Sequence, residues 1–328
     1  MLKALRASGR VVAVSLLVAA PCALQAQTYP TRPVTMVVTF PPGGPADTFG
    51  RLWAQVLSAQ LGQPVVVENV GGAGGTIGLA RVARAAPDGY TLMLGNLGQV
   101  TAVSLYRKLA YHPVDAFDAI GMIAEIPYMV VGRKDLPARS ISELLAYIRA
   151  NAPQVTYANA GTASGSHLCG LLLMSSLKVQ MNVISYRGSG PAMTDVIGQR
   201  IDVFCDQTIT AVGPVKSGAI NGYAVTTQTR APSVPHLPTL QEAGLKDFDL
   251  FAWFGIAAPK GLARPIVDRL AQALQAGLSE PSFLVRLGEV GAQPASRERA
   301  TPEGFTAYMR AEVAKWTPII EAAGVYAD

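Results

Sequence analysis

The chain has 328 residues, of which 50% are hydrophobic and 15% charged, with 32 glycines and 23 prolines. This composition is ordinary for a folded protein and excludes a disordered, collagen-like or disulfide-dense chain. The formal net charge is +5, but Lys3, Arg6 and Arg10 all lie in the first ten residues, and no basic block follows them. The charge therefore gives no support to nucleic-acid binding.

The first 26 residues have the three parts of a secretory signal peptide. A basic head is followed by the apolar stretch Val11–Ala20 and by a small, polar stretch that ends near Ala26. About ten apolar residues are too few to span a bilayer. We therefore expect cleavage after Ala26 and export to the periplasm. The remaining chain contains only Cys169 and Cys205, which an oxidising compartment allows to pair, but we expect buried free thiols.

Short β-branched segments alternate with glycine-rich loops and helical patterns. A strand is predicted at 34–40, followed by a Pro/Gly loop and a helix from Pro45 that ends before Gly62. The same order recurs at 155–172 and at 183–199, and 201–206 is a further predicted strand. This alternation indicates parallel α/β sheets. No linker separates two halves, as expected for two domains joined by crossing strands.

Helix starts are also marked in the sequence. Ser140 and Glu143 have the spacing of a capping box, and Pro265 and Pro302 open two helical patterns near the C-terminus. The segment Gly71–Gly78 does not fit a dinucleotide-binding or phosphate-binding loop, and it is interpreted as a turn before a helix.

The sequence offers little for metal or covalent chemistry. The three histidines lie far apart without cysteine or acidic partners at ligand spacing, so no metal and no cofactor is expected. Ser164 and Ser166 lie beside His167, but adjacent helical residues do not face each other and no G-x-S-x-G elbow is present. A secreted serine hydrolase that uses Ser166 and His167 remains the alternative function.

Backbone groups are better candidates for a binding site. Gly43, Gly44 and the segment Ser164–Ser166 lie where predicted strands end and helices begin. Such turns leave N–H groups without acceptors at a positive helix end, which suits a carboxylate or phosphate. Asp47 and Asp206 are either favourable charges near helix starts or acceptors for a ligand ammonium or hydroxyl.

Several motifs resemble one family along the whole predicted mature chain. They are Pro30–Val34, Phe40–Asp47, Leu61–Asn69, Gly72–Gly78, Pro87–Leu92, Ser166–Leu168, Tyr186–Ala192, Pro238–Gly244, Trp253–Gly255 and Lys315–Trp316. In these segments the chain resembles the Bug-type receptors, which are the periplasmic solute-binding proteins of tripartite tricarboxylate transporters.

The resemblance implies an α/β clamshell with a ligand cleft between two lobes. Domain 1 is expected at 27–128 and 250–328, and domain 2 at 129–249. Main-chain amides and ordered water from both domains are expected to hold a small organic carboxylate. The implied ligand-binding residues are Phe40, Pro42, Gly43, Gly44, Asp47, Gly161, Thr162, Ser164, Gly165, Ser166, His167 and Asp206.

The resemblance also implies partners. The protein is expected to be a monomer that performs no reaction and hands its ligand to an inner-membrane permease. A receptor that passes the same ligand signal to a sensor kinase would use the same binding chemistry, so the sequence leaves that alternative open.

Overall fold

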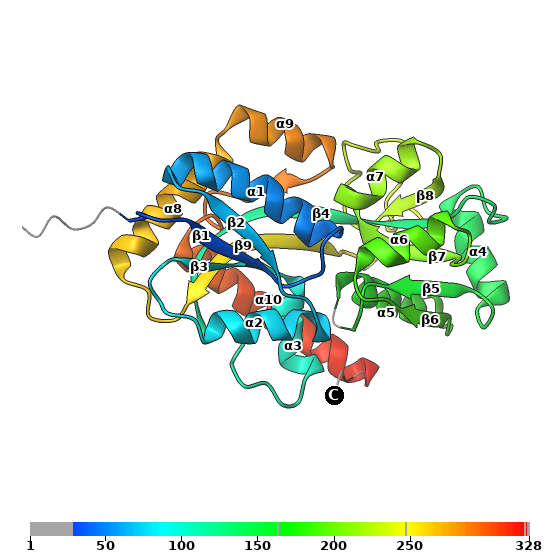
Figure 1. Cartoon of the computed structure of the whole chain (residues 1–328). Helices are drawn as coiled ribbons and strands as arrows, with labels where there is room; N and C mark the ends of the chain where they lie inside the picture. Colours follow the sequence, from blue (N-terminus) through cyan, green and yellow to red (C-terminus); the bar gives the residue numbers. More distant parts are fainter. Residues whose placement is uncertain (1–28, 163, 247, 325, 327–328) are drawn as a thin grey trace, which may run out of the picture.

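The structure, a computed structural model, describes residues 29–162, 164–246, 248–324 and 326. The predicted signal peptide at 1–26 lies outside the described residues. The ten strands assigned to them form one mixed sheet in the order β2-β1-β3-β9-β4-β7-β5-β6, and β8 and β10 also pair with β4. Helices flank this sheet in two halves that lie side by side (Figure 1).

The first half combines the N-terminal and C-terminal parts of the chain. Strands β1 (Val34–Val38), β2 (Val65–Asn69) and β3 (Thr91–Asn96) are parallel. Its helices are α1 (Pro45–Leu61), α2 (Thr76–Ala83), α3 (Leu97–Leu105), α8 (Arg264–Leu278), α9 (Pro281–Glu289) and α10 (Pro302–Ala323). A helix or turn follows each parallel strand and carries the chain back along the sheet, so that the carboxyl ends of these strands lie at the same end of the sheet.

The second half repeats this arrangement with the middle of the chain. Strands β5 (Thr156–Asn159), β6 (Asn182–Ser185) and β7 (Val203–Gln207) are parallel, and β8 (Ile220–Val225) pairs with β4. Its helices are α4 (Ile141–Asn151), α5 (Gly165–Leu177), α6 (Ser189–Ile197) and α7 (Thr208–Lys216).

Two long strands connect the halves. β4 (Phe117–Arg133) pairs with β9 (Phe251–Pro259) along its first part and with β7 and β8 along its last part. Both strands run from one half to the other in Figure 1. They are antiparallel to their neighbours β3 and β7, whereas the sequence predicted parallel sheets only. The short β10 (Gln293–Pro294) also pairs with β4. The predicted α/β clamshell is confirmed.

Local signals explain where helices begin. Pro45 occupies the first turn of α1, and Gly62 ends that helix in the left-handed conformation at φ 71°. The Ser140 hydroxyl accepts a hydrogen bond from the Glu143 N–H at 3.2 Å, as predicted. The glycine-rich segment forms a single 3-10 turn, Ala73–Gly75, directly before α2, so its interpretation as a turn is also confirmed.

The prediction of free thiols is wrong. Cys169 of α5 and Cys205 of β7 form a disulfide, with their Cα atoms 6.3 Å apart. Both residues are fully buried. The parallel β5–α5 unit returns α5 across β7, which brings together two cysteines that are 36 residues apart in sequence.

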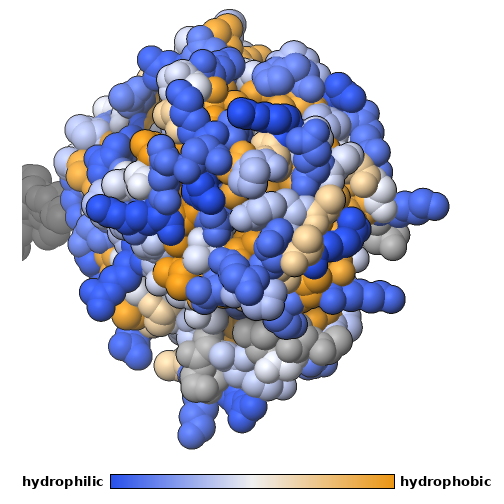
Figure 2. All heavy atoms as spheres, turned by 90° about the vertical axis from the view of Figure 1, so that its right-hand side faces the viewer, coloured by the Kyte–Doolittle hydropathy of each residue, from blue (hydrophilic) through white to orange (hydrophobic). Residues whose placement is uncertain are grey.

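The surface shows polar and apolar groups intermixed. On the outer end of the second half, hydrophilic side chains cover most of the area and apolar ones occur in small separate patches (Figure 2). None of the described helices is long and apolar enough to span a membrane. The described residues also contain no cluster of His, Cys, Asp and Glu suited to a metal ion.

Candidate functional site

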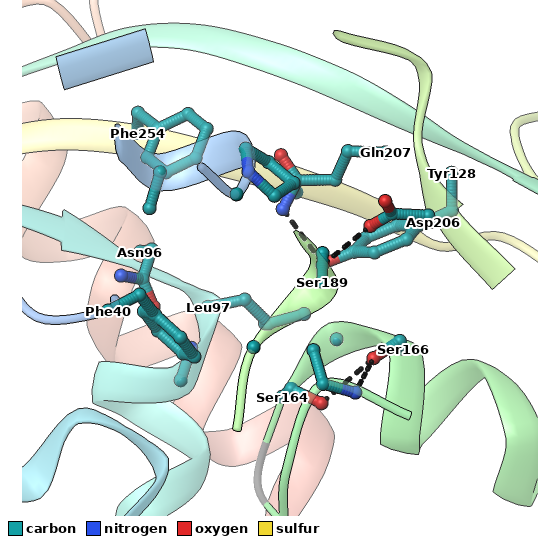
Figure 3. Close-up of a pocket in the computed structure, with 18 of the residues that line it drawn as sticks. Phe40, Asn96, Leu97, Tyr128, Ser164, Ser166, Ser189, Asp206, Gln207 and Phe254 are labelled. Atoms are coloured by element: carbon teal, nitrogen blue, oxygen red, sulfur yellow. Dashed lines mark hydrogen bonds between the residues drawn. The ribbon is translucent and has the colours of Figure 1, made fainter. Parts of the chain in front are cut away.

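A cleft lies between the two halves, at the carboxyl ends of the parallel strands (Figure 3). Ligands of open α/β sheets bind at this edge. The lining residues are Phe40, Pro41, Gly44, Pro45, Ala46, Asn96, Leu97, Gly98, Tyr128, Ala160, Ser164, Gly165, Ser166, Gly188, Ser189, Asp206, Gln207, Ala252 and Phe254. None of these described residues is Arg or Lys.

Five of the described helices direct their N-termini at this cleft. The lining contains the N-cap residue of each, namely Gly44 of α1, Asn96 of α3, Ser164 of α5, Gly188 of α6 and Gln207 of α7. The first-turn N–H groups of a helix have no acceptor within the helix, and each N-terminus carries a partial positive charge. The cleft therefore presents a positive potential that comes from backbone, which suits an anion.

The structure brings together half of the sequence-predicted binding residues in the cleft lining. Phe40, Gly44, Ser164, Gly165, Ser166 and Asp206 belong to it. Pro42, Gly43, Asp47, Gly161, Thr162 and His167 do not.

The residues outside the lining support the loops. Pro42 and Gly43 are exposed, and the Gly43 N–H donates to Asp47 at 3.0 Å. Gly43 has a φ of +83° and Gly161 a φ of +110°, conformations that glycine adopts without strain. Arg187, whose place in the sequence favours a solvated surface residue over a direct counter-ion, is exposed and does not line the cleft.

Ser164 and Ser166 form a closed hydrogen-bond network that shapes the loop before α5. The Ser164 hydroxyl donates to the Gly161 carbonyl at 2.6 Å and accepts from the His167 N–H at 3.2 Å. Ser166 shares a 2.9 Å hydrogen bond with Ser164, and its hydroxyl accepts from the Ala160 N–H at 2.8 Å. Since the Ser164 proton goes to Gly161, Ser166 is the donor to Ser164, and both hydroxyl protons stay within the loop.

The two acids that the sequence left ambiguous have different surroundings. Asp47 is buried, and Arg51 pairs with it at 2.9 Å. Burial alone would raise the pKa of Asp47, but the hydrogen bonds from Arg51 and from Gly43 outweigh it and hold the pKa below its usual value. Asp47 therefore acts as a paired charge in the first turn of α1.

Asp206 has no such partner. It is 1% exposed, and the ion pairs of the described residues do not include it. The hydroxyls of Ser189 and Thr210 donate to its two carboxylate oxygens at 2.9 and 2.7 Å. These hydrogen bonds lower its pKa, but burial is the larger effect and raises the pKa of Asp206 to about 6.

Several lining residues were missed by the sequence analysis. Tyr128 and Phe254 lie within the long strands β4 and β9, away from the strand-to-helix loops on which the predicted site was based. Asn96 ends β3 and Ser189 begins α6 after β6, so their position between a strand and a helix could have identified them. The Asn96 side chain caps α3 by accepting from the Gly98 N–H at 2.9 Å.

The side chain of Tyr128 and the backbone at Gly165 are fitted to each other. A Cβ atom at Gly165 would overlap the hydroxyl and ring of Tyr128. Glycine thus allows the buried tyrosine to reach the first turn of α5. Burial raises the pKa of Tyr128 above its usual range, so its hydroxyl is a neutral hydrogen-bond donor and acceptor that faces the cleft.

The chain is similar to known proteins along most of its length. Residues 49–325 match the model of the tripartite tricarboxylate transporter family receptor. A protein from the TAR-I ttuE-ttuC' intergenic region of Agrobacterium vitis is 45% identical over 305 residues, which are 93% of this chain and 88% of that protein. BugT of Bordetella pertussis is 32% identical over 309 residues, covering 94% and 93% of the two chains.

Solved structures show the same fold. The periplasmic binding protein BugD superposes with a TM-score of 0.88 at 44% identity, covering 91% of this chain and 99% of its own. MatC from Rhodopseudomonas palustris, solved with bound malate, gives 0.84 at 37% identity, with 89% and 100% covered. An R. palustris protein solved with adipate gives 0.86 at 33% identity, with 91% and 99% covered. The chain therefore belongs to the tripartite tricarboxylate transporter receptor family.

Proposed function

We propose that the protein captures a small organic carboxylate in this cleft and hands it, unchanged, to a membrane permease. The convergence of five helix N-termini on a cleft without a lining Arg or Lys carries the proposal. Each helix end contributes roughly 0.3–1 kcal/mol to holding an anion. Backbone N–H groups bind a carboxylate without adding a mobile side chain, so the site is already organised before the ligand enters.

The relatives support the ligand class. Two proteins with the same fold were solved with malate and adipate, both of which are dicarboxylates. The cleft of this chain adds apolar contact from Phe40, Tyr128 and Phe254, which suits the carbon skeleton of such an acid. Ligand-binding residues are assigned on this basis to Gly44, Asn96 and the first turn of α5.

The two lobes are assigned to 27–128 with 250–328, and to 129–249. Strand pairing supports these boundaries, because β4 changes partner from β9 at Pro127 to β7 at Tyr128. Loops of the two lobes approach closely at the cleft: a Cβ at Gly44 would lie 3.8 Å from Ser189. A hinge in β4 and in the chain before β9 would open the cleft, and ligand that contacts both lobes favours closure.

The hydrolase alternative is not favoured. Both serine protons stay within the loop, and the hydrogen bonds of the described residues include none between the His167 side chain and either serine. Burial also lowers the pKa of His167, which weakens it as a base. A signalling receptor would use the same site, and a permease gene beside this one would favour transport.

The proposed function also requires export of the protein to the periplasm. A signal peptide cleaved after Ala26 would place the mature protein in the periplasm, where its disulfide is stable. Amino-terminal sequencing of periplasmic material should begin near Gln27, and an intact Met1 on mature protein would contradict export by cleavage.

A thermal-unfolding screen tests the proposed function. Mono-, di- and tricarboxylates, aromatic acids and amino acids are added separately, each with a matched uncharged amide as control. A ligand at 100 times its dissociation constant stabilises the native state by about 2.7 kcal/mol. We expect at least one acid to stabilise the native state to this extent, and its amide to give no stabilisation. We also expect that acid to be recovered unchanged after incubation with the protein. Stabilisation by no acid, or turnover of the acid, would refute the proposal.

A further inference from the structure

Asp206 is at odds with a site that binds only an anion. It lines the cleft, it is the single charged side chain in the described lining, and its charge has the same sign as the proposed ligand. At 1% exposure it has little contact with water. A ligand carboxylate against it would bring two like charges together in a buried place, which is unfavourable.

The hydrogen bonds show which form of Asp206 the site is built for. Ser189 and Thr210 donate one hydroxyl proton to each carboxylate oxygen, so the group acts as an acceptor. An ionised carboxylate has about four acceptor positions, of which the two hydroxyls and the backbone N–H of Gln207 occupy up to three. Acceptor capacity is therefore left for a group that enters the cleft.

The cleft has two chemically different ends. Asp206 lies beside Ser189 and Tyr128, where its charge offsets the N-termini of α6 and α7 (Figure 3). Phe40 and Asn96 lie on the opposite side. The N-terminus of α3, which Asn96 caps, is on that side and has no acid in the cleft lining, so the ligand carboxylate belongs there and a hydrogen-bond donor belongs at Asp206.

We propose that Asp206 determines ligand specificity by accepting a hydrogen bond from a hydroxyl or ammonium group that the ligand carries beside its carboxylate. The inference rests on the proposed carboxylate-binding function and narrows its ligand to hydroxy or amino acids. A hydrogen bond to a buried charge strengthens binding by roughly 10- to 100-fold. An acid without the donor leaves this remaining acceptor position of the buried Asp206 unfilled when the lobes close.

Asp47 provides a matched control within the chain. It is also a buried acid at a helix N-terminus, but it is paired with Arg51 and does not line the cleft. Asp206→Asn and Asp47→Asn make the same chemical change, and only the first removes charge from the lining. A change in preference among ligands reports recognition, whereas a loss of folded protein lowers all binding equally.

The test uses sets of acids that differ at one position. Calorimetric affinities are measured for succinate, malate and aspartate, for glutarate, 2-hydroxyglutarate and glutamate, and for propionate, lactate and alanine. In the set that binds best, we expect the hydroxy or amino acid to bind at least 10-fold tighter than the plain acid. Asp206→Asn should reduce that ratio to about threefold or less, and Asp47→Asn should leave it unchanged.

Other results overturn the inference. Equal affinity within the best set, or a ratio that survives Asp206→Asn, removes the role of Asp206 but leaves carboxylate binding intact. Loss of the ratio in Asp47→Asn instead would assign the acceptor to Asp47. Binding by no acid of the three sets also overturns it, and the proposed function fails as well only if the wider screen finds no ligand.

The pH dependence of ligand affinity gives a second test of the role of Asp206. The titratable groups near Asp206 are Tyr128 and Tyr157, whose pKa values burial raises, so both stay neutral around pH 7. Since the pKa of Asp206 is about 6, affinity for malate should fall as the pH drops below 6, where the acceptor becomes protonated. Affinity for succinate should instead fall as the pH rises above 6. Opposite slopes support the inference, and parallel slopes contradict it.

Discussion

Replacing Gly165 by alanine is expected to abolish detectable carboxylate binding. The new methyl group would occupy the space of the Tyr128 hydroxyl and ring, and Tyr128 is itself 3% exposed, so the tyrosine or the first turn of α5 must shift. Overpacking of this kind costs roughly 1–3 kcal/mol, which a domain of ordinary stability tolerates. The folded protein would then have a displaced tyrosine and a distorted first turn in α5. Calorimetry should show at least a 100-fold loss of affinity.

Gly213→Ala is the control for this substitution. Gly213 also lies in a helix of the second half, α7, and a Cβ there meets no atom within 4 Å. The Gly213→Ala variant should keep the ligand affinity and the folding stability of the wild type. Normal binding by Gly165→Ala would mean that the fit between Gly165 and Tyr128 has no part in ligand capture.

Removing the disulfide is expected to cause the largest loss of stability. The bond joins α5 to β7 across 36 residues of sequence. For a loop of this length the chain-entropy relation gives about 4 kcal/mol. Urea unfolding of Cys169→Ala/Cys205→Ala should show this loss. Because Cys205 directly precedes Asp206, and α5 begins at Gly165 in the lining, affinity should also weaken.

The wild-type protein with a reductant is the control here. Its unfolding curve should move towards that of the double variant, while the reductant leaves the variant itself unchanged. An unfolding midpoint of the double variant equal to that of the oxidised wild type would show that the bond adds no stability.

The sequence predicted those helices and strands whose ends are marked by a loop or a capping residue. The helix from Pro45 ends at Leu61, and the loop around Ser164 precedes α5, because proline, glycine and capping residues act over a few positions. The antiparallel strands β4 and β9 were not predicted, since Phe117–Arg133 and Phe251–Pro259 are buried almost throughout and a buried strand shows no alternation.

The site was predictable where one loop forms it and not where the topology assembles it. Gly44 and Ser164 were found because each lies between a strand and a helix. Tyr128 reaches the cleft because β4 crosses between the lobes, and the disulfide forms because β7 lies under α5. Both depend on contacts between distant parts of the chain, which residue spacing does not encode.

A crystal structure of the protein with the best acid from the screen would show how the carboxylate is held. We expect the acid between Phe40–Ala46 and Ser164–Ser166, with its carboxylate oxygens within hydrogen-bond distance of helix N-terminal N–H groups, directly or through one water. We expect no Arg or Lys side chain in contact with that carboxylate. An acid clamped by an arginine, or bound outside the cleft between the lobes, would contradict binding of the carboxylate by backbone groups.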